Sequence, residues 1–167
     1  LSHASFLRVE QVTATGLASV AHSDVEALVR TQLQGSYLHL FAKNNILIYP
    51  QDTIAQMLRS EYPQFKLVDV RAQDFSTIAV VVVEREPKSL WCPDGESAKT
   101  GGCYVMDEDG VVYARAAAGE PLYIEYRGAV SGESLPRQYL SPEAFHALSA
   151  FVGAVAQKES TERIVRV

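Results

Sequence analysis

The chain has 167 residues, 47% of them hydrophobic and 21% charged, with a formal net charge of -5 at pH 7. This composition is typical of a globular protein that buries a core, and it excludes a wholly disordered chain. No run of Lys or Arg exceeds a pair, which argues against a surface for nucleic acid or anionic lipid. The longest apolar stretch, 78–83, is far shorter than the roughly 20 residues that span a bilayer. Because the chain begins at Leu1 rather than Met, we expect a segment of a longer protein.

The first part of the chain contains one expected strand, 6–15, and two expected helices. Ser23 and Glu26 have the spacing of a capping box, in which two side chains satisfy backbone N–H groups at a helix start. A second helix is expected to begin with Asp52 as N-cap and to end before Pro63. Each helix has its apolar residues on one face, so both are expected to cover a sheet. The two stripes are Val25, Leu28, Val29 and Leu33, and Ile54, Met57, Leu58 and Tyr62.

Residues 66–91 predict a hairpin followed by a charged boundary. From 68 to 72 every second residue is apolar, the pattern of a half-buried strand. After a turn at 74–76, the return strand 77–83 is β-branched almost throughout and apolar on both faces, so we expect a central strand that is covered on both sides. Residues 6–86 therefore predict the order β-α-α-β-β, a small sheet with two helices on one face.

Beyond Pro87 the pattern changes to short strands and frequent turns. Asp109 and Gly110, between apolar segments, predict a hairpin within 104–114, and 89–91 and 121–127 predict further strands. The sequence thus predicts an α+β protein with two domains, 1–86 and a β-rich 87–167.

One helix is expected in the second domain, starting at Ser141 with Pro142 in its first position. Residues 164–167 have strand-like sequence and end the chain without a downstream partner strand. The buried face of the helix is expected to consist of Phe145, Leu148, Phe151, Val152 and Val155.

Cys92 and Cys103 bracket a polar, glycine-containing loop. A disulfide between them would contribute on the order of 3 kcal/mol by closing that loop, and it would indicate an oxidising compartment. The alternative is two unrelated thiols.

No motif for catalysis is present: there is no Gly-x-Ser-x-Gly, no glycine-rich phosphate loop and no His-Glu-x-x-His. The four histidines are scattered without the spacing of metal ligands, and the acidic cluster 107–109 offers too few oxygens for calcium. We therefore expect no enzyme, no cofactor and no metal site.

Taken together, several features resemble the FtsQ/DivIB family of bacterial cell division proteins over nearly the whole chain. They are the order β-α-α-β-β, the spacing from Pro63 through Val70 and Arg71 to the valine strand, the Glu84-Arg85-x-Pro87 boundary, Trp91, and the hairpin Asp109-Gly110-Val111-Val112-Tyr113.

The resemblance implies a POTRA domain (1–86) and a β-domain (87–167) outside the cytoplasmic membrane, on its periplasmic or outer face at the division septum. It also implies a transmembrane helix upstream of Leu1. Members of the family are non-enzymatic divisome scaffolds that bind the bitopic proteins FtsB (DivIC) and FtsL and control septal peptidoglycan synthesis. The alternative is a POTRA module from an outer-membrane assembly or secretion component, which would be followed by further POTRA repeats.

Two partner-binding segments follow from the resemblance. A recruitment patch on the second POTRA strand matches Val70 and Arg71, while Ala72 replaces a residue that is often charged in the family. FtsB adds a strand to the last sheet edges of the β-domain, which in this chain corresponds to Arg163, Ile164, Val165, Arg166 and Val167. The expected domain junction comprises Glu84, Arg85, Pro87 and Trp91, with Trp91 as a packing residue.

Overall fold

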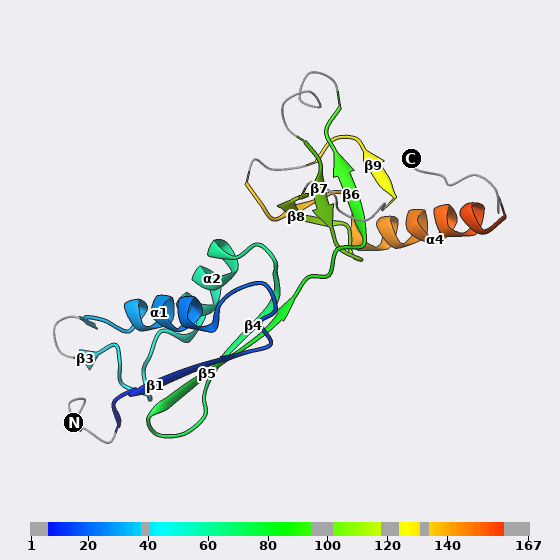
Figure 1. Cartoon of the computed structure of the whole chain (residues 1–167). Coiled ribbons are helices and arrows are strands. Elements are labelled where there is room, and N and C mark those ends of the chain that lie inside the picture. Colours follow the sequence, from blue (N-terminus) through cyan, green and yellow to red (C-terminus); the bar gives the residue numbers. More distant parts are fainter. Residues whose placement is uncertain (1–6, 38–40, 95–101, 118–123, 131–133, 159–167) are drawn as a thin grey trace. The chain divides into compact units, whose positions relative to one another are not determined.

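The computed structural model describes residues 7–37, 41–94, 102–117, 124–130 and 134–158 (Figure 1). The chain divides into two compact units, Leu1–Glu84 and Arg85–Val167. Both contain helices and strands, which confirms the α+β class. Among the described residues, no helix is both long enough and apolar enough to cross a membrane.

Unit 1 has the expected β-α-α-β-β order, with a short two-stranded hairpin inserted between its helices. Its main sheet has the order β1-β5-β4, with β5 parallel to β1 and antiparallel to β4. The valine-rich strand is therefore central, as predicted. The elements are β1 (Gln11–Thr15), α1 (His22–Gln32), β2 (Ser36–Tyr37), β3 (Phe41–Ala42), α2 (Gln51–Glu61), β4 (Phe65–Ala72) and β5 (Thr77–Glu84).

Both helices pack on one face of this sheet, as Figure 1 shows. Val25 and Val29 of α1 and Ile54 and Leu58 of α2 are fully buried, together with alternate residues of β5. This alternation follows from the strand's period of two, which directs successive side chains to opposite faces.

The expectation that β5 is covered on both faces is wrong. Val83 is 50% exposed and its cross-strand neighbour Leu67 is 51% exposed. The helices lie on one face only, and no other element of the described residues covers the second face. β-Branched residues also suit an exposed pleated surface, so an apolar strand does not by itself prove burial on both sides.

The predicted side-chain caps of both helices are also wrong. Helix α1 begins two residues earlier than expected, with Ala21 as N-cap and no side-chain cap, and the hydroxyl of Ser23 bonds to Asp24 instead. Helix α2 begins after Pro50, which places Asp52 inside the first turn. Ser23 and Asp52 therefore lie too far into their respective helices to cap them. The negative charge of Asp52 is still favourable in the first turn, which is the positive end of the helix dipole.

The first strand is shorter than expected, because β1 starts only at Gln11. It ends at Thr15 and is followed by Gly16, whose φ is +80° and whose missing Cβ would lie 2.0 Å from the carbonyl oxygen of Val82. A side chain at this position would collide with backbone, so the close approach of this turn to β5 requires glycine.

Unit 2 is a five-stranded sheet of order β10-β8-β7-β6-β9, with β9 parallel to β6 and the other pairs antiparallel. The predicted hairpin is present, with Gly110 at φ +76° in its turn. The elements are β6 (Ser89–Cys92), β7 (Tyr104–Met106), β8 (Val111–Arg115), β9 (Glu125–Arg127), β10 (Arg137–Gln138) and α4 (Pro142–Lys158).

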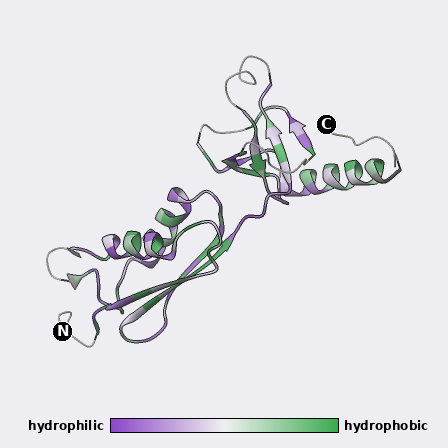
Figure 2. Ribbon diagram, in the orientation of Figure 1, coloured by the Kyte–Doolittle hydropathy of each residue, from purple (hydrophilic) through white to green (hydrophobic). Residues whose placement is uncertain are grey.

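Helix α4 starts as predicted: the backbone N–H of Ala144 donates to the Ser141 hydroxyl. Figure 2 shows that α4 is hydrophobic along most of its length. Phe145 and Val152 are buried, but Phe151 is 68% exposed, so its assignment to the buried face is wrong. Phe151 is about 100° around the helix from Val152, outside the narrow stripe that contacts the sheet.

Candidate functional site

The first candidate site is the outer edge of β4, which carries Val70, Arg71 and Ala72. Since the sheet order is β1-β5-β4, no other described strand pairs with this edge. Val70 is 1% exposed and belongs to the core, whereas the side chain of Arg71 is 65% exposed on the helix-free face and lies 3.7 Å from Asp69. Of the predicted patch, only Arg71 and Ala72 therefore present side chains to solvent, and Val70 contributes through its backbone.

The register with β5 determines which backbone groups of β4 point outward. The N–H of Gln73 donates to the carbonyl of Thr77, so this pair is hydrogen-bonded. In an antiparallel ladder such pairs alternate with pairs whose N–H and C=O groups face away. Val68, Val70 and Ala72 therefore direct their backbone groups to the outer edge. The N–H of Ala72 is already bonded to the hydroxyl of Tyr49, whose pKa is raised mainly by burial.

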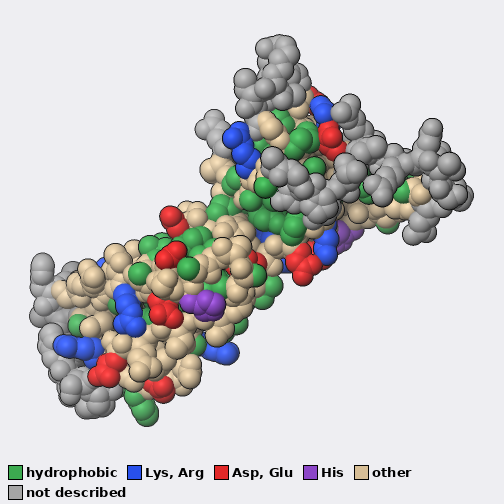
Figure 3. All heavy atoms as spheres, in the orientation of Figure 1, with side chains coloured by type: hydrophobic (Ala, Val, Ile, Leu, Met, Phe, Trp, Pro, Cys, Tyr) green, Lys and Arg blue, Asp and Glu red, His purple; other side chains and the backbone are tan. Residues whose placement is uncertain are grey.

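An apolar pocket of about 480 Å³ lies at the end of this edge, between the segment before α2 and the β4–β5 turn. Two of its lining side chains, Leu47 and Phe75, are 69% and 75% exposed. Figure 3 shows hydrophobic side chains protruding at the end of unit 1 where this hairpin turns. The Asp74 carboxylate holds the turn by accepting hydrogen bonds from the N–H groups of Ser76 and Thr77, which lower the pKa of Asp74.

Glu84 is the last residue of unit 1 and is bonded within that unit. Its carboxylate accepts hydrogen bonds from the N–H of Ala18 (2.8 Å) and from the N–H and hydroxyl of Ser19 (3.1 and 2.7 Å). Burial alone would raise the pKa of Glu84, but these bonds outweigh it and the pKa is lowered. Glu84 thereby ties the end of β5 to the loop after β1.

Arg85, the next residue, is bonded within unit 2. Its guanidinium donates to Oδ2 of Asp107 at 2.5 Å, and the Asp107 side chain is only 2% exposed. The other carboxylate oxygen, Oδ1, accepts from the backbone N–H groups of Asp109 and Val111 at 2.9 Å each. Asp107, one of the three residues of the acidic cluster 107–109, is thus a buried group that organises the β7–β8 turn.

The remaining junction residues differ in their surroundings. Pro87 is exposed. Trp91 is 6% exposed and belongs to the core of unit 2, where its indole N–H donates to the carbonyl of Gly128 at 3.0 Å. The guanidinium of Arg137 lies 5.2 Å from the Trp91 ring centre. Trp91 thus packs in the core of unit 2, and the contacts named here all lie inside that unit.

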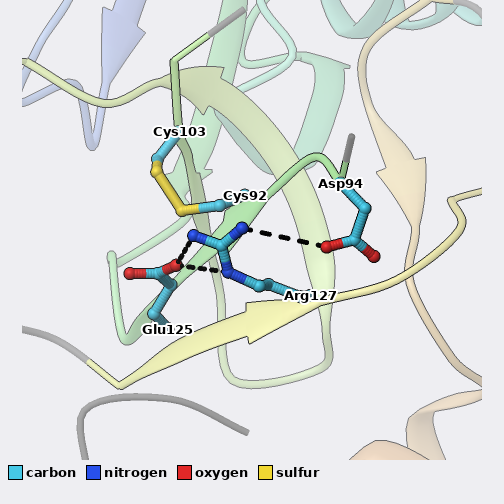
Figure 4. The surroundings of a disulfide bond; sticks show 5 residues. All are labelled: Cys92, Asp94, Cys103, Glu125 and Arg127. Carbon is cyan, nitrogen blue, oxygen red and sulfur yellow. Dashed lines mark hydrogen bonds and ion pairs between the residues drawn. A yellow bond between two sulfur atoms is a disulfide. The ribbon is translucent and has the colours of Figure 1, made fainter. Parts of the chain in front are cut away.

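Cys92 and Cys103 form a disulfide that joins the end of β6 to the start of β7. Figure 4 shows Arg127 of β9 beside this bond, with its guanidinium paired to Glu125 and Asp94. The bridge closes the loop between two neighbouring antiparallel strands, so it restrains the open end of that strand pair.

In the described parts of the chain, no three His, Cys, Asp or Glu side chains are grouped closely enough to hold a metal ion. The second predicted partner segment, Arg163, Ile164, Val165, Arg166 and Val167, lies outside the described residues.

No protein-family model matches the chain. Among curated proteins, the cell division protein FtsQ of Streptomyces bingchenggensis (strain BCW-1) is 30% identical over 121 residues. The aligned region is 71% of this chain and 40% of that protein. The chain is therefore similar to an FtsQ-type cell division protein and spans less than half of its length.

Replacing Glu84 with Gln is expected to lower the free energy of unfolding of unit 1 by about 1 kcal/mol at neutral pH, since partly exposed charged hydrogen bonds are worth about that much. Because the pKa of folded Glu84 is lowered, this stabilisation is present above the ordinary glutamate pKa and is lost as the pH falls through the folded value. Urea denaturation followed by circular dichroism near pH 7 and about pH 3 measures the loss of unfolding free energy and its dependence on pH. A stability difference between wild type and variant that is as large at about pH 3 as near pH 7 would contradict this role of Glu84. Glu86→Gln, at an exposed site, is the control.

Replacing Asp107 with Asn is expected to destabilise unit 2 by about 3 kcal/mol, because it leaves the largely buried guanidinium of Arg85 without its charge partner. The chain has one tryptophan, Trp91, in the core of unit 2, so its fluorescence reports on this unit during denaturation. The neighbouring exposed change Glu108→Gln serves as the control. Equal stability of the two variants would show that the Arg85–Asp107 pair has no structural importance.

Replacing both Cys92 and Cys103 with Ser is expected to destabilise unit 2 by about 3 kcal/mol, the size typical for closing a loop of this length. The same Trp91 fluorescence measurement applies. Addition of a thiol reductant should lower the stability of the wild type and leave the double variant unchanged. If reductant affects both proteins equally, the loss does not arise from the disulfide.

Proposed function

We propose that this chain is the extracytoplasmic part of an FtsQ/DivIB-type division protein, with a POTRA domain at 1–86 and a β-domain at 87–167. The observation that carries the proposal is the 30% identity to FtsQ over 71% of the chain. The β-α-α-β-β order of unit 1 and the unit boundary after Glu84 support it.

The proposed activity is binding rather than catalysis: the protein acts as a scaffold for FtsB/DivIC-like and FtsL-like bitopic proteins and so helps to control septal peptidoglycan synthesis. Strand addition needs unpaired backbone groups and pockets for alternate side chains. The outer edge of β4 offers the backbone groups of Val68 and Val70, and the pocket at Leu47 and Phe75 offers an apolar anchor at its end.

The second proposed docking segment is 163–167, to which FtsB or DivIC would add a strand. The proposed location is the periplasmic or outer face of the membrane at the division septum, with the chain anchored by an upstream helix. The Cys92–Cys103 disulfide supports a location outside the reducing cytosol, because such bonds persist in oxidising compartments.

The alternative, a POTRA module of an outer-membrane assembly or secretion component, has less support. Such proteins carry successive POTRA repeats, whereas the described part of unit 2 has a five-stranded sheet with one long helix and does not repeat the β-α-α-β-β order.

Binding of the full chain to a peptide from an FtsB/DivIC-type protein tests the proposal. We expect binding by isothermal calorimetry, and we expect Ile164→Pro or Val165→Pro to abolish it, because proline removes a backbone donor and cannot continue a ladder. Circular dichroism should show an unchanged fold in both variants. Absence of binding by the wild type, using a chain with the native C-terminus, would count against the scaffold function, and unchanged binding by the proline variants would exclude strand addition at this segment.

A further inference from the structure

The outer edge of β4 carries an acidic and a basic residue, one on each side of Val70. Asp69 and Arg71 flank Val70, and both side chains lie on the helix-free face, where they are 45% and 65% exposed. Their mutual distance of 3.7 Å makes a weak surface ion pair, which is readily exchanged for other partners.

This order of charges is self-complementary. If the β4 strands of two copies pair in antiparallel fashion about a two-fold axis at Val70, Asp69 of each copy lies opposite Arg71 of the other. Two opposite-charge cross-strand pairs result, one on each side of the axis, and such pairs stabilise a sheet. We propose that the chain associates with a second copy of itself through β4, forming a continuous six-stranded sheet from the two three-stranded sheets of unit 1.

The hydrogen-bonding pattern is compatible with this register. Val68 and Val70 direct their N–H and C=O groups outward, so Val70 pairs with Val70 of the second copy through two hydrogen bonds. At Ala72 the outward N–H is bonded to the hydroxyl of Tyr49, which takes the place that Val68 of the second copy would occupy. The shared ladder therefore consists of the Val70 pair and ends before Ala72.

Neighbouring registers are disfavoured by charge. An axis at Asp69 places the two Asp69 carboxylates opposite each other, and an axis at Arg71 does the same for the two guanidinium groups. Like charges directly opposite one another destabilise a strand pair. A register shifted by a single residue in one strand would also turn the buried face of one sheet outward. Among these registers, only the axis at Val70 avoids pairs of like charges and also keeps the buried faces of both sheets on the same side.

Self-pairing occupies the same edge that is proposed above for a partner protein, so the two interactions exclude each other. The association of two copies would cover the exposed edge until a partner replaces the second copy. The self-association itself does not depend on the proposed division function, because it follows from the charges and register of β4.

Sedimentation velocity of the full chain over a range of concentrations tests the inference, without any partner present. The wild type should shift from monomer to dimer as its concentration rises. Asp69→Arg and Arg71→Asp each convert both attractive pairs into repulsive ones, and each variant alone should raise the dimer dissociation constant by about tenfold or more. Both positions are exposed, so the variants should keep the fold, which circular dichroism verifies.

An equimolar mixture of the two variants provides the decisive measurement. In the mixed pair, one chain carries arginine at both positions and the other carries aspartate at both, so opposite charges face each other at each contact. Dimer formation should therefore return to near the wild-type level. Glu143→Arg, on α4 of unit 2, makes the same change in net charge as Asp69→Arg and should leave the association unchanged. A wild type that stays monomeric at every concentration, or a mixture that associates no better than either variant alone, would overturn the proposal.

Discussion

Strand β5 determines the arrangement of unit 1, because it is hydrogen-bonded on both sides, to β1 in parallel and to β4 in antiparallel orientation. Its buried residues Ile78, Val80 and Val82 lie on the face of the sheet that the two helices cover. No further described strand pairs with the other side of β4, so β4 lies at the edge of the described sheet. Its outer backbone groups form the edge that is proposed for docking.

The boundary between the units depends on two neighbouring residues with opposite charges and separate partners. Glu84 is held by backbone and hydroxyl donors of the loop after β1, while Arg85 is held by the buried carboxylate of Asp107. The carboxylates of Glu84 and Asp107 both accept hydrogen bonds, and a buried charge is tolerated only when it is paired in this way. The short Glu-Arg motif therefore ends one unit and begins the other through contacts that each unit supplies for itself.

The candidate sites of this protein are surfaces rather than reaction centres. Backbone groups at a sheet edge, with an apolar pocket beside them, favour an extended protein segment as ligand, because an edge supplies regularly spaced donors and acceptors but no reacting group. Whether the segment comes from a division partner or from a second copy depends on side chains such as Asp69 and Arg71, which set register and specificity more than affinity.

The sequence by itself determined the β-α-α-β-β order of the main elements of unit 1, the central position of β5 and the hairpin at Asp109 and Gly110, because apolar periodicity and turn residues are local signals. It did not reveal the short strands β2, β3 and β10. Only the tertiary structure decided that one face of β5 stays open, that Phe151 of α4 is exposed and that Asp107 is buried beside Arg85. It also decided that Ala72 loses its free N–H to Tyr49. These properties depend on contacts between segments that are distant in the sequence, and a local sequence pattern does not specify such contacts.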